Sequence, residues 1–271
     1  MGDVAAHQDL WIQETGRKPS VRLTSLPGAS ESPEWSPDGT HILFAVSNKR
    51  NRDIYWIRSD AAGEPRLLAK YEGNMDPVAF SPDGKLVLLE SGNPFTAMDV
   101  WSTSLEGTLD HPQLGKPEPL LRARGFPMPA FSPDGHWLAY ASEESRRREV
   151  YVQPFPGPGG KVPISTDGGG FPQWSPNGRE LFFLSPDRRI MVVDYTIKGN
   201  SFLPSVPRLW SKQQILLKSG GGPFQSYALA PDGKRFAVIL YADGTTEHLN
   251  PLHQTFLLNF GDELSRRVPA E

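Results

Sequence analysis

Residue types that could carry out catalysis are scattered along this chain of 271 residues and do not form a known catalytic motif. A kinase requires a glycine-rich phosphate loop, a catalytic-loop Asp with its Asn, and a metal-binding Asp-Phe-Gly. The glycine runs 168–170 and 220–222 are not followed by Lys-Ser/Thr, so we interpret them as loose connections. A serine hydrolase requires a Gly-x-Ser-x-Gly elbow, which is also missing. We therefore expect a chain that is not an enzyme and has no catalytic residue.

Side chains that could bind a metal show no suitable spacing either. Of the six histidines, only His248 and His253 are close together, without the Glu of a helical zinc motif. The pair Glu143-Glu144 stands beside a run of three arginines and predicts a solvated loop, because a catalytic carboxylate pair needs burial. The sequence thus predicts no metal site and no cofactor.

A repeated aspartate has a structural explanation. The phrase Trp35-Ser36-Pro37-Asp38-Gly39 recurs four times, with first residues 45, 51, 43 and 55 positions apart. Pro presets the first corner of a tight turn, Asp or Asn can bond its own backbone, and Gly supplies the left-handed conformation. We expect structural hairpin turns with these Asx-Gly pairs: Asp38 and Gly39, Asp83 and Gly84, Asp134 and Gly135, Asn177 and Gly178, Asp232 and Gly233.

Composition narrows the possible partners. The formal net charge is −3 with both signs mixed, so we expect no nucleic-acid partner. The chain has no cysteine, and therefore no disulfide. The first residues lack the pattern of a signal peptide, and no stretch approaches the roughly 20 apolar residues that span a bilayer. As written, the chain is expected to be soluble and without a membrane span.

The repeats must be built from strands. Each turn phrase is followed by apolar runs of strand length separated by polar loops, such as residues 48–52, and no long segment keeps a helical period. A period of this length is typical of a β-propeller with four-stranded blades. We expect an all-β single domain over residues 1–271, with a partial N-terminal blade in 1–25 and five repeat units in 26–271. Residues 9–12 and 20–24 would supply two strands of the partial blade, and residues 255–260 a last strand.

The aromatic-Ser-Pro-Asp-Gly turn followed by an apolar strand resembles the TolB-like, WD-like β-propeller repeat over nearly the whole chain. Segments 148–156, 164–170, 178–183 and 258–264 more closely resemble the C-terminal propeller regions of acidobacterial-type serine/threonine kinase-associated proteins. This resemblance implies six blades, an extracytoplasmic or periplasmic location, and a link to a larger kinase protein. Such proteins usually carry another repeat upstream of Asp9, so the first blade is expected to be incomplete; five blades are the alternative.

Ligands of a propeller are expected where the connections to the inner strands converge at one mouth of the channel. The residues of these connections are Glu31, Asp76, Arg124, Phe126, Phe171, Phe224 and Gln225. Mixed charge and exposed aromatic rings favour a protein or peptide partner. We therefore expect a binding scaffold of a bacterial sensory or envelope-associated system. A propeller hydrolase or lyase with its site at this mouth is the alternative.

Overall fold

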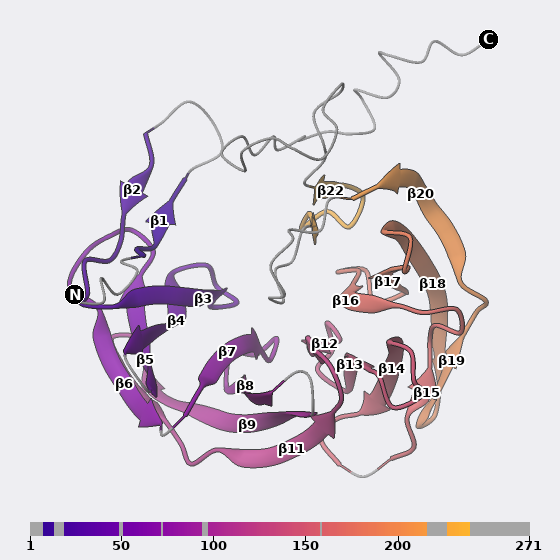
Figure 1. Ribbon diagram of the computed structural model, residues 1–271, viewed down its shortest axis with the longest axis horizontal. Helices are drawn as coiled ribbons and strands as arrows, with labels where there is room; N and C mark the ends of the chain where they lie inside the picture. Colours follow the sequence, from indigo (N-terminus) through magenta and orange to yellow (C-terminus); the bar gives the residue numbers. More distant parts are fainter. Residues whose placement is uncertain are drawn as a thin grey trace, which may run out of the picture. The chain divides into compact units, whose positions relative to one another are not determined.

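A computed structural model describes residues 8–13, 19–48, 51–71, 73–93, 97–157, 159–215 and 227–238. Every regular element in these residues is a β-strand, and none of them forms a helix that could cross a membrane. The chain divides into two compact units, Met1–Phe131 (unit 1) and Ser132–Glu271 (unit 2). Consecutive antiparallel sheets follow the sequence in each unit, as Figure 1 shows by colour. The expected all-β class is confirmed.

Unit 1 contains two large sheets and a short hairpin. The hairpin pairs β1 (Trp11–Ile12) with β2 (Val21–Arg22). The first sheet has the order β3 (Ala29–Trp35), β4 (His41–Asn48), β5 (Asn51–Arg58) and β6 (Arg66–Tyr71). The second consists of β7 (Met75–Phe80), β8 (Leu86–Asn93), β9 (Ala97–Thr108), β10 (His111–Leu114) and β11 (Glu118–Ala123), with β10 and β11 both paired to β9. The last strand of the unit is β12 (Ala130–Phe131).

Unit 2 follows the same scheme. Its first strands are β13 (Trp137–Ser142), β14 (Glu149–Pro154) and β15 (Val162–Pro163). The next sheet contains β16 (Gly170–Trp174), β17 (Glu180–Leu184), β18 (Arg189–Lys198), β19 (Ser201–Pro204) and β20 (Arg208–Gln214), with β19 and β20 both paired to β18. The strands β21 (Tyr227–Leu229) and β22 (Phe236–Val238) form the last described pair. The expected strand at 255–260 lies outside the described residues, as do Phe224 and Gln225.

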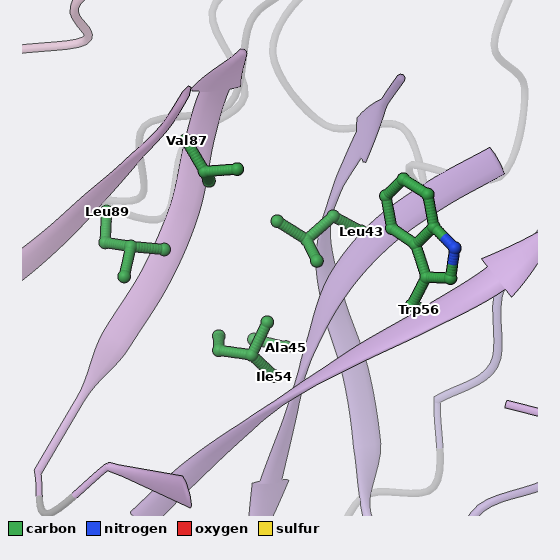
Figure 2. Packing of buried hydrophobic residues seen from close by; sticks show 6 residues of the cluster. All are labelled: Leu43, Ala45, Ile54, Trp56, Val87 and Leu89. Carbon is green, nitrogen blue, oxygen red and sulfur yellow. The ribbon is translucent and has the colours of Figure 1, made fainter. Parts of the chain in front are cut away.

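The core of unit 1 lies between its two large sheets. Side chains of a strand alternate between its two faces, so one face of β4 can meet the next sheet. Figure 2 shows the resulting cluster, which consists of Leu43, Ala45, Ile54, Trp56, Val87 and Leu89. The opposite face of β4 carries Ile42, Phe44 and Val46, against which Leu10 and Ile12 of the N-terminal segment pack. Both faces of the sheet are therefore covered, although Trp11 remains 59% exposed.

The five repeated turns share one geometry. Each Gly lies at a φ between 66° and 72° and donates its backbone N–H to the carbonyl three residues earlier, over 2.8–3.0 Å. In the first turn Ser36 Oγ donates to Asp38 Oδ1 at 2.6 Å, and the backbone N–H of His41 donates to Ser36 Oγ at 3.0 Å. A sixth turn, Ser185-Pro186-Asp187-Arg188, repeats the serine-to-aspartate bond and the backbone bond over three residues. It places Arg188 at a φ of 66° and is one residue shorter, since Ser185 Oγ accepts from the backbone N–H of Arg189. The sequence search missed it because it lacks the glycine.

The serine hydroxyl of the fourth turn lacks the hydrogen bonds that the serine hydroxyls of the first three turns make, and this difference leads to a prediction. Ser132 Oγ bonds both Asp134 and the backbone N–H of Trp137, whereas the fully buried Ser175 Oγ has no hydrogen-bond partner. A lost buried hydrogen bond typically costs about 1–2 kcal/mol, whereas removal of an unpaired polar atom costs nothing or stabilises. We expect Ser132→Ala to lower the free energy of unfolding by that amount and Ser175→Ala to leave it unchanged. Chemical denaturation measures both, and equal losses would contradict the assignment.

Several expectations about loops are wrong. Most of the polar loop expected at 48–52 belongs to strands, because Asn48 ends β4 and pairs with Asn51, which begins β5 together with Arg52. The glycine run 168–170 is not loose: all three residues are buried, and a Cβ on Gly169 would come within 2.9 Å of Phe183 Cδ2. The extra strands β10 and β19, which lengthen two hairpins, were not predicted either.

Candidate functional site

The inner strands β3, β7 and β16 each carry a β-bulge a few residues before the turn. The register shifts lie between Glu31 and Glu34 in β3, between Pro77 and Ala79 in β7, and between Gly170 and Gln173 in β16. Each places one extra residue on the inner strand. Bulges redirect side chains and are common beside functional sites. In unit 1 the bulged strands β3 and β7 each carry a carboxylate, Glu31 and Asp76, that contacts the same arginine.

The residue three positions before the turn aromatic has an unusual backbone. Ser32, Met128 and Phe171 occupy this position in three repeats, and their φ angles are 51°, 45° and 57°. Non-glycine residues avoid this region because their Cβ crowds the backbone. Each of the three directly precedes a proline, so the same conformation recurs in the same sequence context. Residues held in such conformations cluster at functional sites.

Arg52 of β5 links the two sheets of unit 1 at this point. Its Nη2 lies 2.9 Å from Glu31 Oε2 of β3, and its Nη1 contacts both carboxylate oxygens of Asp76 of β7. Ser47 Oγ donates to Glu31 Oε2 at 2.9 Å, and Ser32 Oγ donates to Asp76 Oδ1 at 3.1 Å. The Arg52, Glu31 and Asp76 side chains are 24%, 31% and 22% exposed, so the network is only partly open to solvent.

Two further carboxyl groups of unit 1, Glu34 of β3 and Glu90 of β8, titrate near neutral pH. Burial, together with the charge of Glu90, raises the pKa of Glu34 to about 8. Burial also raises the pKa of Glu90 to about 7; the charge of Asp76 adds to this, and the backbone N–H of Met128, 3.0 Å from Glu90 Oε1, opposes it. We call Glu31, Glu34, Asp76, Glu90 and Arg52 the acidic centre.

The acidic centre can do two kinds of chemistry. The Arg52 guanidinium contacts two carboxylates, Glu31 and Asp76. Glu90 lies within electrostatic range of Asp76 and Glu34 within range of Glu90, so carboxyl groups outnumber the cation and the centre can accept a further one. In addition, carboxyl groups whose pKa lies near 7 can give and take protons at physiological pH, as general acids and bases do. In the described part of the chain, no group of three or more His, Asp or Glu side chains is arranged to hold a metal ion.

The structure places the other expected site residues as follows. Arg124 is exposed and Phe126 half-buried, both between β11 and β12 of unit 1. Phe171 of unit 2 is only 7% exposed, and its carbonyl accepts a hydrogen bond from the Tyr227 hydroxyl. The expectation of an exposed aromatic ring is therefore wrong at Phe171, whose side chain belongs to the core of unit 2.

Sequence reasoning missed Arg52, Glu34 and Glu90. Arg52 was assigned to a polar loop, although a two-residue hairpin between the apolar strands would have placed it in β5 opposite Ser47. Glu90 was missed because it follows an apolar run and precedes a serine, so the strand was expected to end before it. A charged residue within a buried strand was the available signal.

No protein-family model matches this sequence. Among curated proteins, it is 28% identical over 185 residues to an uncharacterized protein, Atu1656, of Agrobacterium fabrum, covering 64% of this chain and 60% of that protein. It is 26% identical over 179 residues to the uncharacterized peptidase YuxL of Bacillus subtilis, covering 53% and 27%. A match to the Tol-Pal system protein TolB of Chromobacterium violaceum has 28% identity over 75 residues and covers 24% and 17%. The chain thus spans less than two thirds of the length of each of these relatives.

Solved structures show the fold. TolB from Acinetobacter baumannii superposes with a TM-score of 0.61 at 18% identity, covering 87% of this chain and 54% of that one. The periplasmic gluconolactonase PpgL of Pseudomonas aeruginosa has a TM-score of 0.55 at 16% identity, covering 88% and 71%. A puromycin-hydrolyzing peptidase of Mycobacterium tuberculosis has a TM-score of 0.51 at 16% identity, covering 74% and 37%. The chain has a TolB-like β-propeller fold.

These comparisons correct one expectation. The absence of familiar motifs predicted a chain that is not an enzyme, but a lactonase and a peptidase share the fold, and a curated peptidase is a sequence relative. The prediction was wrong because it considered only catalytic motifs that are recognisable in the sequence, whereas one fold can carry many different sites. Hydrolase activity therefore belongs among the candidate functions of this chain.

Proposed function

We propose that this chain is a β-propeller module that binds a peptide or protein partner through basic groups at the acidic centre of unit 1. The observation that carries the proposal is the Arg52 guanidinium between the Glu31 and Asp76 carboxylates of two bulged inner strands, with the buried carboxyl groups of Glu34 and Glu90 electrostatically coupled to this network. Its similarity to Tol-Pal system and TolB proteins supports a role in a bacterial envelope-associated or sensory system.

Charge and protonation make the acidic centre selective for cations. An ammonium or guanidinium group that approaches Glu34 and Glu90 favours their ionised forms, so binding releases protons when it occurs below their pKa values of about 8 and 7. The attraction between the cation of the ligand and these carboxylates is stronger in the partly desolvated acidic centre than it would be at the open surface. Affinity for a basic peptide should therefore rise with pH between 6 and 8.5.

Calorimetric titration with a tetralysine peptide tests the proposal. We expect the double variant Glu34→Gln/Glu90→Gln to bind at least tenfold more weakly than the wild type, because both titrating carboxylates are removed. The matched control is Glu118→Gln, which removes a carboxylate from the exposed start of β11. Equal affinities of the double variant and the wild type, or no change of affinity from pH 6 to 8.5, would refute the acidic centre as the binding site.

A hydrolase is the second candidate, favoured by the two carboxyl groups Glu34 and Glu90, whose pKa values are about 8 and about 7. The ionised group would take a proton from water as the water oxygen attacks the substrate carbonyl, and the protonated group would give its proton to the leaving oxygen or nitrogen. The samples from the tetralysine titration can be assayed for cleaved peptide. Parallel samples with gluconolactone can be assayed for its hydrolysis product. Turnover that is lost in Glu90→Gln and kept in Glu118→Gln would favour hydrolysis over binding alone.

We also propose the wider organisation of the protein. The turn spacing supports a single propeller over 1–271, with a partial N-terminal blade in 1–25 and five repeat units in 26–271. The resemblance to TolB-like propeller repeats supports six blades in the ring. The resemblance of segments 148–156 and 258–264 to kinase-associated propellers supports a kinase-linked context. The periplasmic gluconolactonase among the similar folds supports an extracytoplasmic location.

A further inference from the structure

The turn end of unit 1, at the other end of β3 and β7 from Glu31 and Asp76, contains a cavity. It has a volume of about 440 Å³, within the range of small-ligand sites. Its apolar walls are Trp56, Phe80, Leu105 and Leu109, and the carboxylates of two repeated turns, Asp38 and Asp83, line it as well. We call this cavity the turn-end pocket.

The hairpin of β9 and β10 forms one wall of the turn-end pocket and is fixed to the first sheet. Trp56 Nε1 donates to the Leu109 carbonyl at 2.9 Å, and Arg66 Nη1 donates to the Asp110 carbonyl at 3.2 Å and to His111 Nδ1 at 2.9 Å. At the base of the hairpin, the backbone N–H of Leu105 donates to the Lys85 carbonyl at 2.8 Å. The wall is therefore held in place before any ligand arrives, which lowers the cost of binding.

The aromatic walls are also fixed. The Trp56 ring stacks on the His41 ring with centroids 4.9 Å apart, and the Phe80 ring lies 6.2 Å from Trp56 at an angle of 59°. Aromatic walls attract cations through the negative charge of their faces, in addition to packing against apolar groups. These rings suit a ligand that combines an apolar stem with a positive charge.

The charged side of the turn-end pocket is anionic at neutral pH. Hydrogen bonds from the Ser36 hydroxyl and from the Thr40 backbone and hydroxyl hold the pKa of Asp38 at about 2. The Ser81 hydroxyl and the Lys85 backbone N–H lower the pKa of Asp83 in the same way. Lys85 Nζ lies 3.7 Å from Asp83 Oδ2, but its side chain is 79% exposed, so a ligand can displace it.

We propose that the turn-end pocket binds an alkylammonium ligand, whose charged end lies at Asp38 and Asp83 and whose stem lies between the apolar walls. The same chemistry occurs in a free primary amine and in a lysine side chain of a peptide. This site is independent of the acidic centre, since it uses the turns rather than the bulged strand starts.

Calorimetric titration with three matched probes tests the proposal. The probes are n-pentylamine, N-acetyl-lysine N-methylamide and the neutral N-acetyl-norleucine N-methylamide, which has a lysine-like stem without the ammonium group. We expect the lysine derivative to bind at least tenfold more tightly than the norleucine derivative. Binding of pentylamine without the lysine derivative would assign the site to free amines. Equal binding of the lysine and norleucine derivatives, with no binding of pentylamine, would overturn the proposal.

The variants use the repeats as internal controls. Asn177 occupies the same turn position in the fourth repeat with its Gly178 at a φ of 66°, so asparagine is compatible with this turn. Asp38→Asn/Asp83→Asn should abolish the tenfold preference for the ammonium probes, whereas Asp134→Asn/Asp232→Asn, outside the pocket, should keep it. Lys85→Gln should strengthen binding of the ammonium probes because it removes the resident cation. The proposal fails if both double variants lose the preference equally.

Discussion

Replacing Glu34 by glutamine is expected to stabilise the protein by up to about 4 kcal/mol more at pH 9 than at pH 5. The native pKa of Glu34 is raised to about 8 from an ordinary value of 4.5, so the folded state favours the neutral carboxyl. The stability that this group contributes is complete below pH 4.5 and is lost progressively as the pH rises to 8. Glutamine stays neutral, and the variant therefore avoids this loss.

The fourth repeat indicates that glutamine fits at this position. Glu34 directly precedes Trp35, and Gln173 directly precedes Trp174. Gln173 Nε2 donates to the Tyr227 carbonyl at 2.9 Å, and Gln173 Oε1 accepts from the Leu229 backbone N–H at 2.8 Å. A neutral amide at this place can thus connect an inner strand to the next one along the chain.

Urea denaturation from pH 5 to pH 9 measures the effect. The wild type should lose stability relative to Glu34→Gln as the pH increases, with most of the divergence complete by pH 8. Glu118→Gln, on the exposed start of β11, serves as the control for removal of a carboxylate and should follow the wild type. Parallel stability curves of wild type and Glu34→Gln would show that Glu34 is not desolvated in the folded state.

Replacing Arg52 by methionine is expected to lower the free energy of unfolding by about 2–3 kcal/mol at pH 7, because two partly buried carboxylates lose their cation. Arg52 contacts Glu31 of β3 and Asp76 of β7, so its removal weakens the link between the two sheets of unit 1. The loss should be smaller than for a fully buried ion pair, since these side chains are 22–31% exposed.

A double-mutant cycle separates the ion pair from the packing of the arginine stem. Asp76→Asn should be less destabilising in the Arg52→Met background than in the wild type. Arg58→Met is the matched control, because Arg58 is also in β5 but pairs with Asp60 at the surface and should contribute little. Additive effects of Arg52→Met and Asp76→Asn would mean that the contact does not stabilise the fold.

Local sequence rules account for most of the fold. The repeated Ser-Pro-Asx-Gly turn needs only the fixed φ of proline, a short side-chain acceptor and a glycine at positive φ, all of which are properties of neighbouring residues. Its regular spacing, with apolar strands between, was enough to predict an all-β propeller. The strand boundaries were less accurate at residues 48–52, where polar side chains continue a strand because its backbone pairs with a neighbour.

Non-local contacts determine the acidic centre. Glu31 and Asp76 were expected at the site because the sequence places both before an inner strand, but their link through Arg52 of β5 joins strands of two different sheets. The raised pKa values of Glu34 and Glu90 arise from burial and from nearby carboxylates on other strands, which no single segment of the sequence specifies. Likewise, the residue type of Phe171 and its place before a repeated turn suggested an exposed ring, but its side chain lies in the core.

The sequence by itself therefore determined the turns, the strand repeat and the all-β class, because each follows from interactions within about ten residues. Only the tertiary structure decided which charges meet, which carboxyl groups are desolvated, and that the β9–β10 hairpin forms the wall of a pocket beside Asp38 and Asp83. These features depend on the packing of one sheet on the next, and burial and charge proximity are properties of that packing rather than of any single segment.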